Sequence, residues 1–184
     1  PDVRFRGKNI DDIKITAELT AIDGEGGILG QAGPTAIRTE GYLPAAGSMQ
    51  FDNADAEYFN SSEVDIWDAI VLHEMLHTLG SGTIWTYLGL IDGTNTSPTF
   101  VGSEAMLAYG DLLGPVPVPL EYGYGPGTDY SHWDELALGN EIMTGFINDT
   151  NVVSDLTVAS LGDLGYTTVD WQSFTDFTIP EAVA

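Results

Sequence analysis

The chain has 184 residues, of which 43% are hydrophobic and none is cysteine. A chain of this size can bury a core without disulfides, so we expect one domain covering residues 1–184. Its 28 acidic and 5 basic residues give a formal net charge of −23. Such a surface repels nucleic-acid phosphates and anionic lipids, which argues against both as partners. It suits calcium-containing surroundings and makes Ca2+ a candidate ion, although no EF-hand loop identifies its ligands.

No run approaches the roughly 18 apolar residues that a membrane-spanning helix needs. The chain begins with Pro1, and no basic segment followed by an apolar one marks a signal peptide. We therefore expect a processed or excised domain. The composition does not determine the oligomeric state.

The first residues predict strands. Residues 13–20 alternate apolar and polar side chains, several of them β-branched, which predicts a strand with one buried face. A glycine-rich turn, Gly24–Gly30, follows, and then two extended segments, near Pro34–Arg38 and at Gly47–Phe51.

A helix is expected next. Ser62, with Asp65 three residues later, fits its N-terminal cap. The helix is apolar on nearly all sides, which is typical of a helix buried in a protein, and Gly80 ends it.

The residues after Gly80 are rich in glycine and proline. Tyrosine and tryptophan side chains lie among them, which indicates ordered packing rather than a linker. We expect short helices near Ser103–Leu113 and Asp155–Leu164, the second capped by Ser154.

The predicted helix before Gly80 contains the sequence His73-Glu74-Met75-Leu76-His77. Residues four apart share one face of a helix, so both histidines can bind one zinc ion at about 2.0–2.1 Å. Glu74 then lies beside the ion, where it can accept a proton from water without being a ligand. A histidine pair that only decorates a buried helix is the alternative, but chance rarely produces this motif in a chain with 3 histidines.

His132 is the remaining histidine of the chain. A catalytic zinc usually has three protein ligands and keeps the fourth position for water. His132 is therefore the candidate third ligand. If His132 is not the ligand, Asp134 or Glu135 is the next candidate.

The residues around these histidines resemble metzincin metalloproteases. In the short form of that motif, a third histidine follows the glycine by three residues, and this chain has Thr83 there. The pattern is similar to the leishmanolysin-like family, including its bacterial members, in which a long insertion separates the glycine from the third histidine. The segment His132–Glu135 resembles the second motif of that family, and Gly139–Phe146 resembles its Met-turn.

The resemblance implies a role for each matching residue. His73, His77 and His132 would be zinc ligands, Glu74 the general base, and Met143 the methionine beneath the metal. Metzincins of the astacin and serralysin types have a tyrosine two residues after this methionine, where this chain has Gly145, so no tyrosine ligand is expected.

The implied fold is an α+β metzincin: a twisted mixed sheet with the active-site helix above a cleft, and an irregular helical lower half. Residues 1–80 would form the upper part, and residues 81–184 the lower part with the third histidine and the Met-turn. The implied activity is that of a secreted or cell-surface zinc endopeptidase with protein or peptide substrates. Function is carried by the site and not by the fold alone.

Substrate binding is predicted at two places. In metzincins an edge strand of the upper sheet binds an extended peptide, and Gly47, Ser48, Met49, Gln50 and Phe51 are our candidates for it. Thr144, Gly145 and Phe146 follow Met143 and would line the pocket beyond the zinc.

The alternative is an extracellular binding or adhesion module, stabilised by zinc or calcium, with an inactive protease-like site. The intact Glu74 favours the enzyme.

Overall fold

The computed structural model describes residues 2–5, 7–61, 64–110, 113–167 and 170–178. These residues divide into two compact units, one within Pro1–Gly80 and the other within Ser81–Ile179. Small sheets and a few helices occur in both, which agrees with the predicted α+β class. Over the described ranges, no helix has the length and apolar character needed to cross a membrane.

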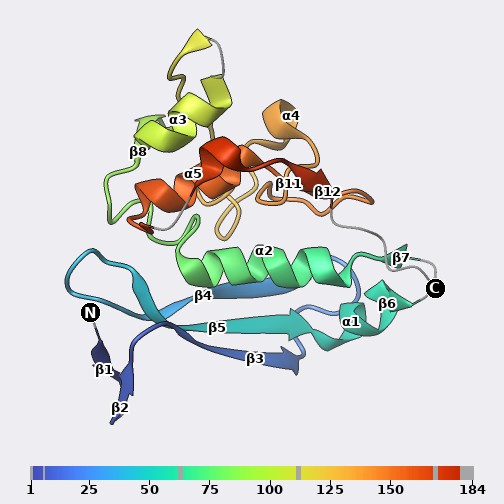
Figure 1. Ribbon diagram of the computed structural model, residues 1–184. Helices are drawn as coiled ribbons and strands as arrows, with labels where there is room; N and C mark the ends of the chain where they lie inside the picture. Colours follow the sequence, from blue (N-terminus) through green and yellow to red (C-terminus); the bar gives the residue numbers. More distant parts are fainter. Residues whose placement is uncertain (1, 6, 62–63, 111–112, 168–169, 179–184) are drawn as a thin grey trace. The chain divides into compact units, whose positions relative to one another are not determined.

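The first unit is built on a three-stranded sheet. Its strands are β3 (Lys14–Thr20), β5 (Pro44–Asp52) and β4 (Gly30–Ile37), in the order β3-β5-β4. β3 is parallel to β5 and β4 is antiparallel to it, so the sheet is mixed, as predicted. Helix α2 (Trp67–Leu79) packs on β4 and β5 (Figure 1).

Burial on β5 explains this packing. Met49 and Phe51 are buried, and the Phe51 ring lies 5.0 Å from that of Trp67 on α2. Alternate residues of a strand point to opposite faces. Gln50 therefore points away from the helix, and its side chain bonds Glu18 of β3 at 2.7 Å and Gln31 of β4 at 2.8 Å.

The predicted strand at residues 13–20 is confirmed as β3, but its predicted buried face is wrong. Leu19 is 60% exposed, and none of the residues of β3 is fully buried. The reason is its position at the edge of the sheet, since α2 packs on the other two strands.

The prediction that Gly47–Phe51 forms an edge strand is also wrong. Gly47, Ser48, Met49, Gln50 and Phe51 all lie in β5, which is the middle strand. β3 and β4 pair with it on either side. Its main chain is therefore not available to a peptide by strand addition.

The remaining elements of the first unit are short. They are β1 (Val3–Phe5), β2 (Lys8–Ile10), α1 (Asn53–Phe59), β6 (Asn60–Ser61) and β7 (Val64–Asp65).

Helix α2 begins later than predicted. Its N-cap is Ile66, which makes no side-chain capping bond, and Ser62 lies outside the described residues. The helix ends at Gly80 as predicted, with φ of 112° and its N–H bonded to the carbonyls of His77 and Leu76. Glycine adopts this left-handed conformation without the steric cost of a Cβ.

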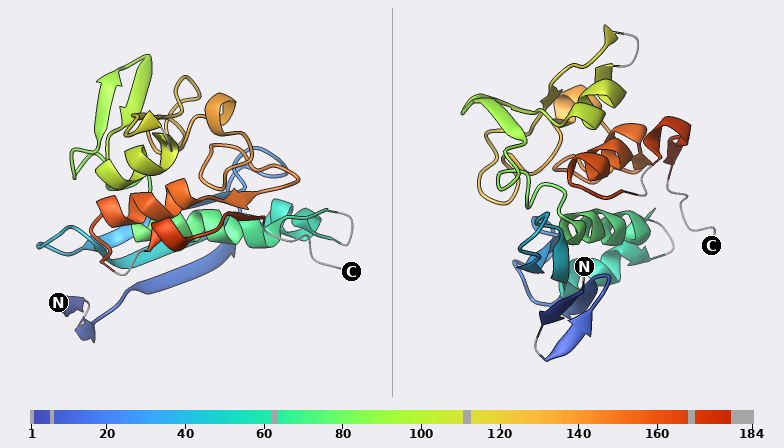
Figure 2. Two further views of the ribbon diagram at one scale, coloured as in Figure 1. Left: turned by 45° about the horizontal axis from the view of Figure 1, so that its top comes forward. Right: turned by 60° about the vertical axis from the view of Figure 1, so that its left-hand side comes forward.

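The second unit has short elements joined by long loops. They are β8 (Ile91–Thr94), β9 (Ser97–Phe100), α3 (Ser103–Gly110), β10 (Val118–Pro119), α4 (Glu135–Leu138), β11 (Val152–Val153), α5 (Asp155–Asp163), the 3-10 helix η2 (Trp171–Ser173) and β12 (Phe177–Thr178). β8, β9 and β10 form an antiparallel sheet, and β11 pairs with β12. Helices α3 and α5 pack against each other (Figure 2).

Both helices predicted in this half are confirmed; α3 is described to Gly110, and residues 111–112 of its predicted range lie outside the described residues. Ser154 caps α5 as predicted, because its side chain accepts the N–H of Thr157. The expected aromatic packing is present as well. Trp85 stacks on Trp133 with ring centroids 4.8 Å apart, and Phe100 lies edge-on to Trp133 at 5.4 Å.

Candidate metal centre

Helix α2 brings His73 and His77 to one face, as their spacing requires. Their Nε2 atoms lie 3.0 Å apart, and their rings are nearly perpendicular at 82°. Two nitrogens that share a tetrahedral zinc at about 2.0–2.1 Å would be roughly 3.3 Å apart. The observed separation is close to that value, so the pair suits a common ion.

Glu74 lies between these histidines in sequence, and its side chain is buried with 5% exposure. Burial raises the pKa of Glu74 to about 8. Its Oε2 is sequestered and has no hydrogen-bond partner within the part of the chain that the structure describes. A buried carboxyl oxygen with no partner is costly, so a ligand, water or ion is expected beside it.

Gly30, the first residue of β4, makes room for this carboxyl group. A Cβ at Gly30 would lie 2.7 Å from Oε1 of Glu74 and 3.0 Å from its Cγ. Any larger residue would displace the Glu74 side chain.

His132 lies on an extended segment of the second unit. The carbonyl of His132 accepts the N–H of Glu121 at 2.9 Å, and the next residue, Trp133, is part of the aromatic core. The side chain of His132 is 7% exposed.

The protonation of His132 follows from its neighbours. Its Nδ1 lies 3.0 Å from the carbonyl oxygen of Thr128 and 3.0 Å from Oγ of Ser131. A carbonyl only accepts, so Nδ1 carries the proton and donates it to Thr128. This tautomer leaves the lone pair on Nε2, as a zinc ligand requires, and the bond to Thr128 fixes the orientation of the ring.

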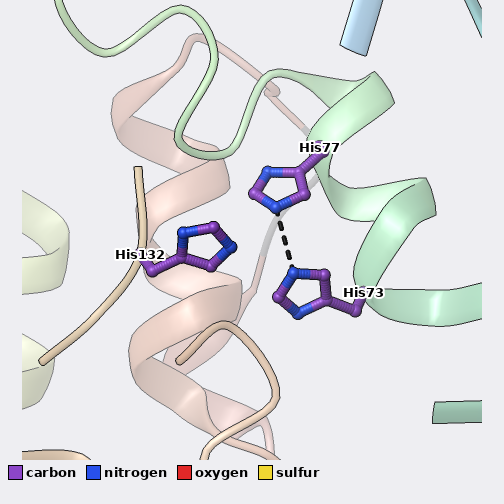
Figure 3. A group of neighbouring side chains, drawn as sticks. All are labelled: His73, His77 and His132. Carbon is purple, nitrogen blue, oxygen red and sulfur yellow. Dashed lines mark hydrogen bonds between the residues drawn. The ribbon is translucent and has the colours of Figure 1, made fainter. Parts of the chain in front are cut away.

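The three histidines form a group that could hold a metal ion. His73, His77 and His132 each offer one ring nitrogen, and these atoms lie within 4.8 Å of one another (Figure 3). Neutral imidazoles of this number and kind are typical of a catalytic zinc site. Over the described ranges, no other group of three or more His, Asp or Glu side chains meets this condition, so the calcium prediction has no support from such a group.

Met143 is fully buried, and its backbone is tied to the His132 segment. The carbonyl of Met143 accepts the N–H of Trp133 at 2.9 Å, and its own N–H donates to Oε2 of Glu141 at 2.6 Å. Oε1 of Glu141 accepts the hydroxyl of Ser154 at 2.7 Å, which links the turn to the cap of α5. Glu141 is itself buried, and burial raises its pKa.

The predicted pocket residues that follow Met143 differ in their surroundings. Thr144 is fully buried, and its hydroxyl is bonded to the carbonyls of Glu141 and Phe146 at 3.1 Å each, so it holds the turn. Gly145 lies close to Thr128, whose Cγ2 would be 2.6 Å from a Cβ at that position. Phe146 is 42% exposed and lies edge-on to Tyr124.

Gly47, one of the predicted substrate residues on β5, lies against helix α2. A Cβ at Gly47 would lie 2.8 Å from Cβ of Thr78, so this glycine permits the close approach of α2 to the sheet.

Sequence patterns did not identify Gly30, Glu141 or Thr128 as parts of the site. Gly30 lies in no motif, Glu141 lies in the Met-turn segment but nothing there indicates its bonds to Met143 and Ser154, and Thr128 acts through its main chain.

Comparison with known proteins agrees with this arrangement of residues. The sequence model of the leishmanolysin family matches residues 12–177, which include all three histidines, Glu74 and Met143. A search of curated protein sequences finds no match. The family match covers most of the chain, and the chain therefore belongs to the leishmanolysin family, whose members are zinc metallopeptidases.

Proposed function

We propose that the chain is a zinc endopeptidase in which His73, His77 and His132 hold the metal and Glu74 is the general base. The observation that supports this most strongly is the group of three histidine nitrogens within 4.8 Å, with Glu74 adjacent to one of its members in sequence. Family membership implies protein or peptide substrates and, for its members generally, an extracellular or surface-attached location. Cleavage within a chain, rather than at its ends, is part of the proposal.

The metal, when bound, supplies Lewis acidity to water and to the scissile carbonyl. Glu74 accepts a proton from the attacking water while the water oxygen bonds to the carbonyl carbon. It then passes that proton to the departing amine nitrogen as the carbon–nitrogen bond breaks. The carboxylate is thereby restored, and no external acid is consumed.

The environment of Glu74 suits this exchange. A pKa raised by burial to about 8 makes the carboxylate a stronger base than an exposed glutamate. A cation held by His73 and His77 would lower this pKa and favour the ionised form. The proton-accepting state is therefore expected in the metal-loaded protein.

We further propose that the peptide pairs with β4 rather than β5. In the order β3-β5-β4, β4 is an outer strand, and it begins at Gly30 beside Glu74. Strand addition there would place an extended chain near the general base through main-chain hydrogen bonds. Phe146, which is exposed, remains a proposed contact for a substrate side chain.

The activity is tested with a peptide blocked at both ends, so that only internal cleavage yields products. We expect cleavage by the zinc-loaded protein, loss of cleavage after chelation and recovery on adding zinc. Zinc content without any turnover over a broad peptide library would instead support the binding or adhesion module.

Pairing with β4 is tested separately with substrates in which single amide groups are replaced by esters. An ester removes one N–H donor and leaves the side chains unchanged. We expect KM to rise for replacements at alternate positions along the peptide. Equal KM values at all positions would contradict strand addition.

A further inference from the structure

Two aspartates are buried beside the glycine-rich loop that joins β3 to β4. Asp52, the last residue of β5, is 0% exposed, and Asp55, in the first turn of α1, is 3% exposed. Both lie within the first unit. The hydrogen bonds of the two carboxylates differ.

Both oxygens of the Asp52 carboxylate accept hydrogen bonds. Its Oδ2 accepts the N–H groups of Ile22, Asp23 and Gly24 at 2.7, 2.9 and 3.0 Å, and its Oδ1 accepts that of Ala54 at 2.8 Å. The bonds from Gly24 and Ala54 contribute most to lowering the pKa of Asp52 to about 2. This carboxylate is therefore ionised and fully satisfied.

Asp55 is only half satisfied. Its Oδ1 accepts the N–H of Gly26 at 2.7 Å, while its Oδ2 is sequestered from solvent and bonds no other described residue. An acid at this position of a helix often reaches back to the N–H of the capping residue. Here the N–H of Asp52 is donated to the carbonyl of Leu29, so capping does not account for Asp55.

No basic side chain in the neighbouring sequence compensates this charge. Residues 15–37 contain no Lys or Arg, and the loop itself adds Asp23 and Glu25. The guanidinium of Arg38 donates to the main-chain carbonyl of Asp11 at 3.0 Å. A buried carboxylate oxygen without a partner is unfavourable, and a cation beside Oδ2 would stabilise it.

We propose that this loop binds a divalent cation with oxygen ligands, namely Ca2+, through Oδ2 of Asp55. Calcium takes six to eight oxygens, including main-chain carbonyls and water, in irregular geometry. The main chain of residues 23–28 and water would supply the ligands that carboxylates do not. Gly24, Gly26 and Gly27 have φ of 94°, 78° and 78°, which allows the loop to turn tightly around an ion. With few carboxylate ligands, the expected Kd is about 10⁻⁴–10⁻³ M.

The site is distinct from the candidate zinc centre, and the inference does not depend on peptidase activity. The histidines offer nitrogen ligands, whereas the loop offers only oxygen. Calcium is therefore expected to leave the zinc content unchanged.

The test uses the full zinc-loaded chain, freed of calcium by dialysis. Calorimetric titration with CaCl2 should give one Ca2+ per chain. At 10 mM, the midpoint of thermal unfolding should rise by about 3–10 °C. Sodium chloride at equal ionic strength should not reproduce this rise, and Mg2+ should produce a smaller one. Absence of binding by the parent chain at 10 mM Ca2+ overturns the proposal.

Asp55→Asn is the decisive variant, since asparagine can still accept the N–H of Gly26 but carries no charge. It should lose the calcium-dependent rise and be at least as stable as the parent without calcium. Glu57→Gln, an exposed change on the same helix, is the matched control and should keep the full rise. An equal rise in Asp55→Asn overturns the proposal. If this variant does not fold, the titration of the parent chain decides.

Discussion

At the scale of residues, the proposed centre depends on how each histidine is held. His73 and His77 take their spacing from α2. His132 has no helix to place it and depends on the carbonyl of Thr128, which fixes its ring and its tautomer. A mutation near His132 can therefore disturb the orientation of its ring, whereas the spacing of His73 and His77 is fixed by the helix.

His132→Ala should lose zinc on dialysis that leaves the parent loaded, because it removes a bond to the metal. Ser131→Ala is the matched control, since it removes the contact between the Ser131 hydroxyl and Nδ1 of His132 but keeps the bond from Nδ1 to the carbonyl of Thr128. Loss of such a supporting contact typically costs about 10–100-fold in metal affinity or activity, and His132→Ala should cost more. Metal analysis and peptide cleavage on both variants check this. Full zinc and activity in His132→Ala would move the third ligand to Asp134 or Glu135.

Asp52 predicts a pH dependence of stability. Its pKa is about 2 in the folded state against an ordinary value of 3.8, so folding favours its ionised form. This contribution is complete above about pH 4 and is lost as the pH falls through about 2. Asp52→Asn should therefore be less stable than the parent at pH 6, with a gap that narrows towards pH 2. Thermal unfolding across this range measures the gap, and a constant gap would show that ionisation is not its cause.

At the scale of elements, the close approach of α2 to β5 depends on Gly47. A Cβ at that position would meet Thr78 at 2.8 Å, so Gly47→Ala should force the helix from the sheet and cost about 1–3 kcal/mol of stability. Thermal unfolding measures this loss, with Gln50→Ala on the opposite face as the comparison. Unchanged stability together with a raised KM would return Gly47 to a role in substrate binding.

The sequence predicted which segments form helices and strands better than it predicted how these elements pack. Alternation at residues 13–20 identified β3, but not that α2 would pack on the other two strands and leave Leu19 exposed. A buried face on β5 is compatible with either a middle or an edge strand, so strand order was not predictable. The cap expected at Ser62 was misplaced because Val64 and Asp65 pair with Ser61 and Asn60 before α2 begins.

In the candidate site, too, local features were predictable from the sequence and contacts between distant segments were not. Helical spacing predicted that His73 and His77 share one face with Glu74 beside them, and the small number of histidines together with the family resemblance pointed to His132. The fit of Gly30 against Glu74, and the bond from the Met143 N–H to Glu141, exist only once distant segments are folded together. Local patterns cannot identify such contacts.

At the scale of the whole molecule, the large acidic excess is separate from the proposed chemistry. The site consists of three imidazoles and one carboxyl group, whereas the chain carries 28 acidic residues. Most of this charge can be solvated at the surface without affecting zinc. The buried pair Asp52 and Asp55 is different, because the loop above it must accommodate the charge locally.

The central claim, that Glu74 performs chemistry and does not bind the metal, is tested most directly by Glu74→Gln. Glutamine has nearly the same volume but cannot take a proton from water. We expect zinc content and thermal stability close to those of the parent, and a peptide cleavage rate lower by about 10²–10⁴-fold. Zinc and cleavage should be measured on one purified sample. Lost zinc would make Glu74 a ligand or a residue needed for folding, and undiminished cleavage would show that catalysis occurs elsewhere.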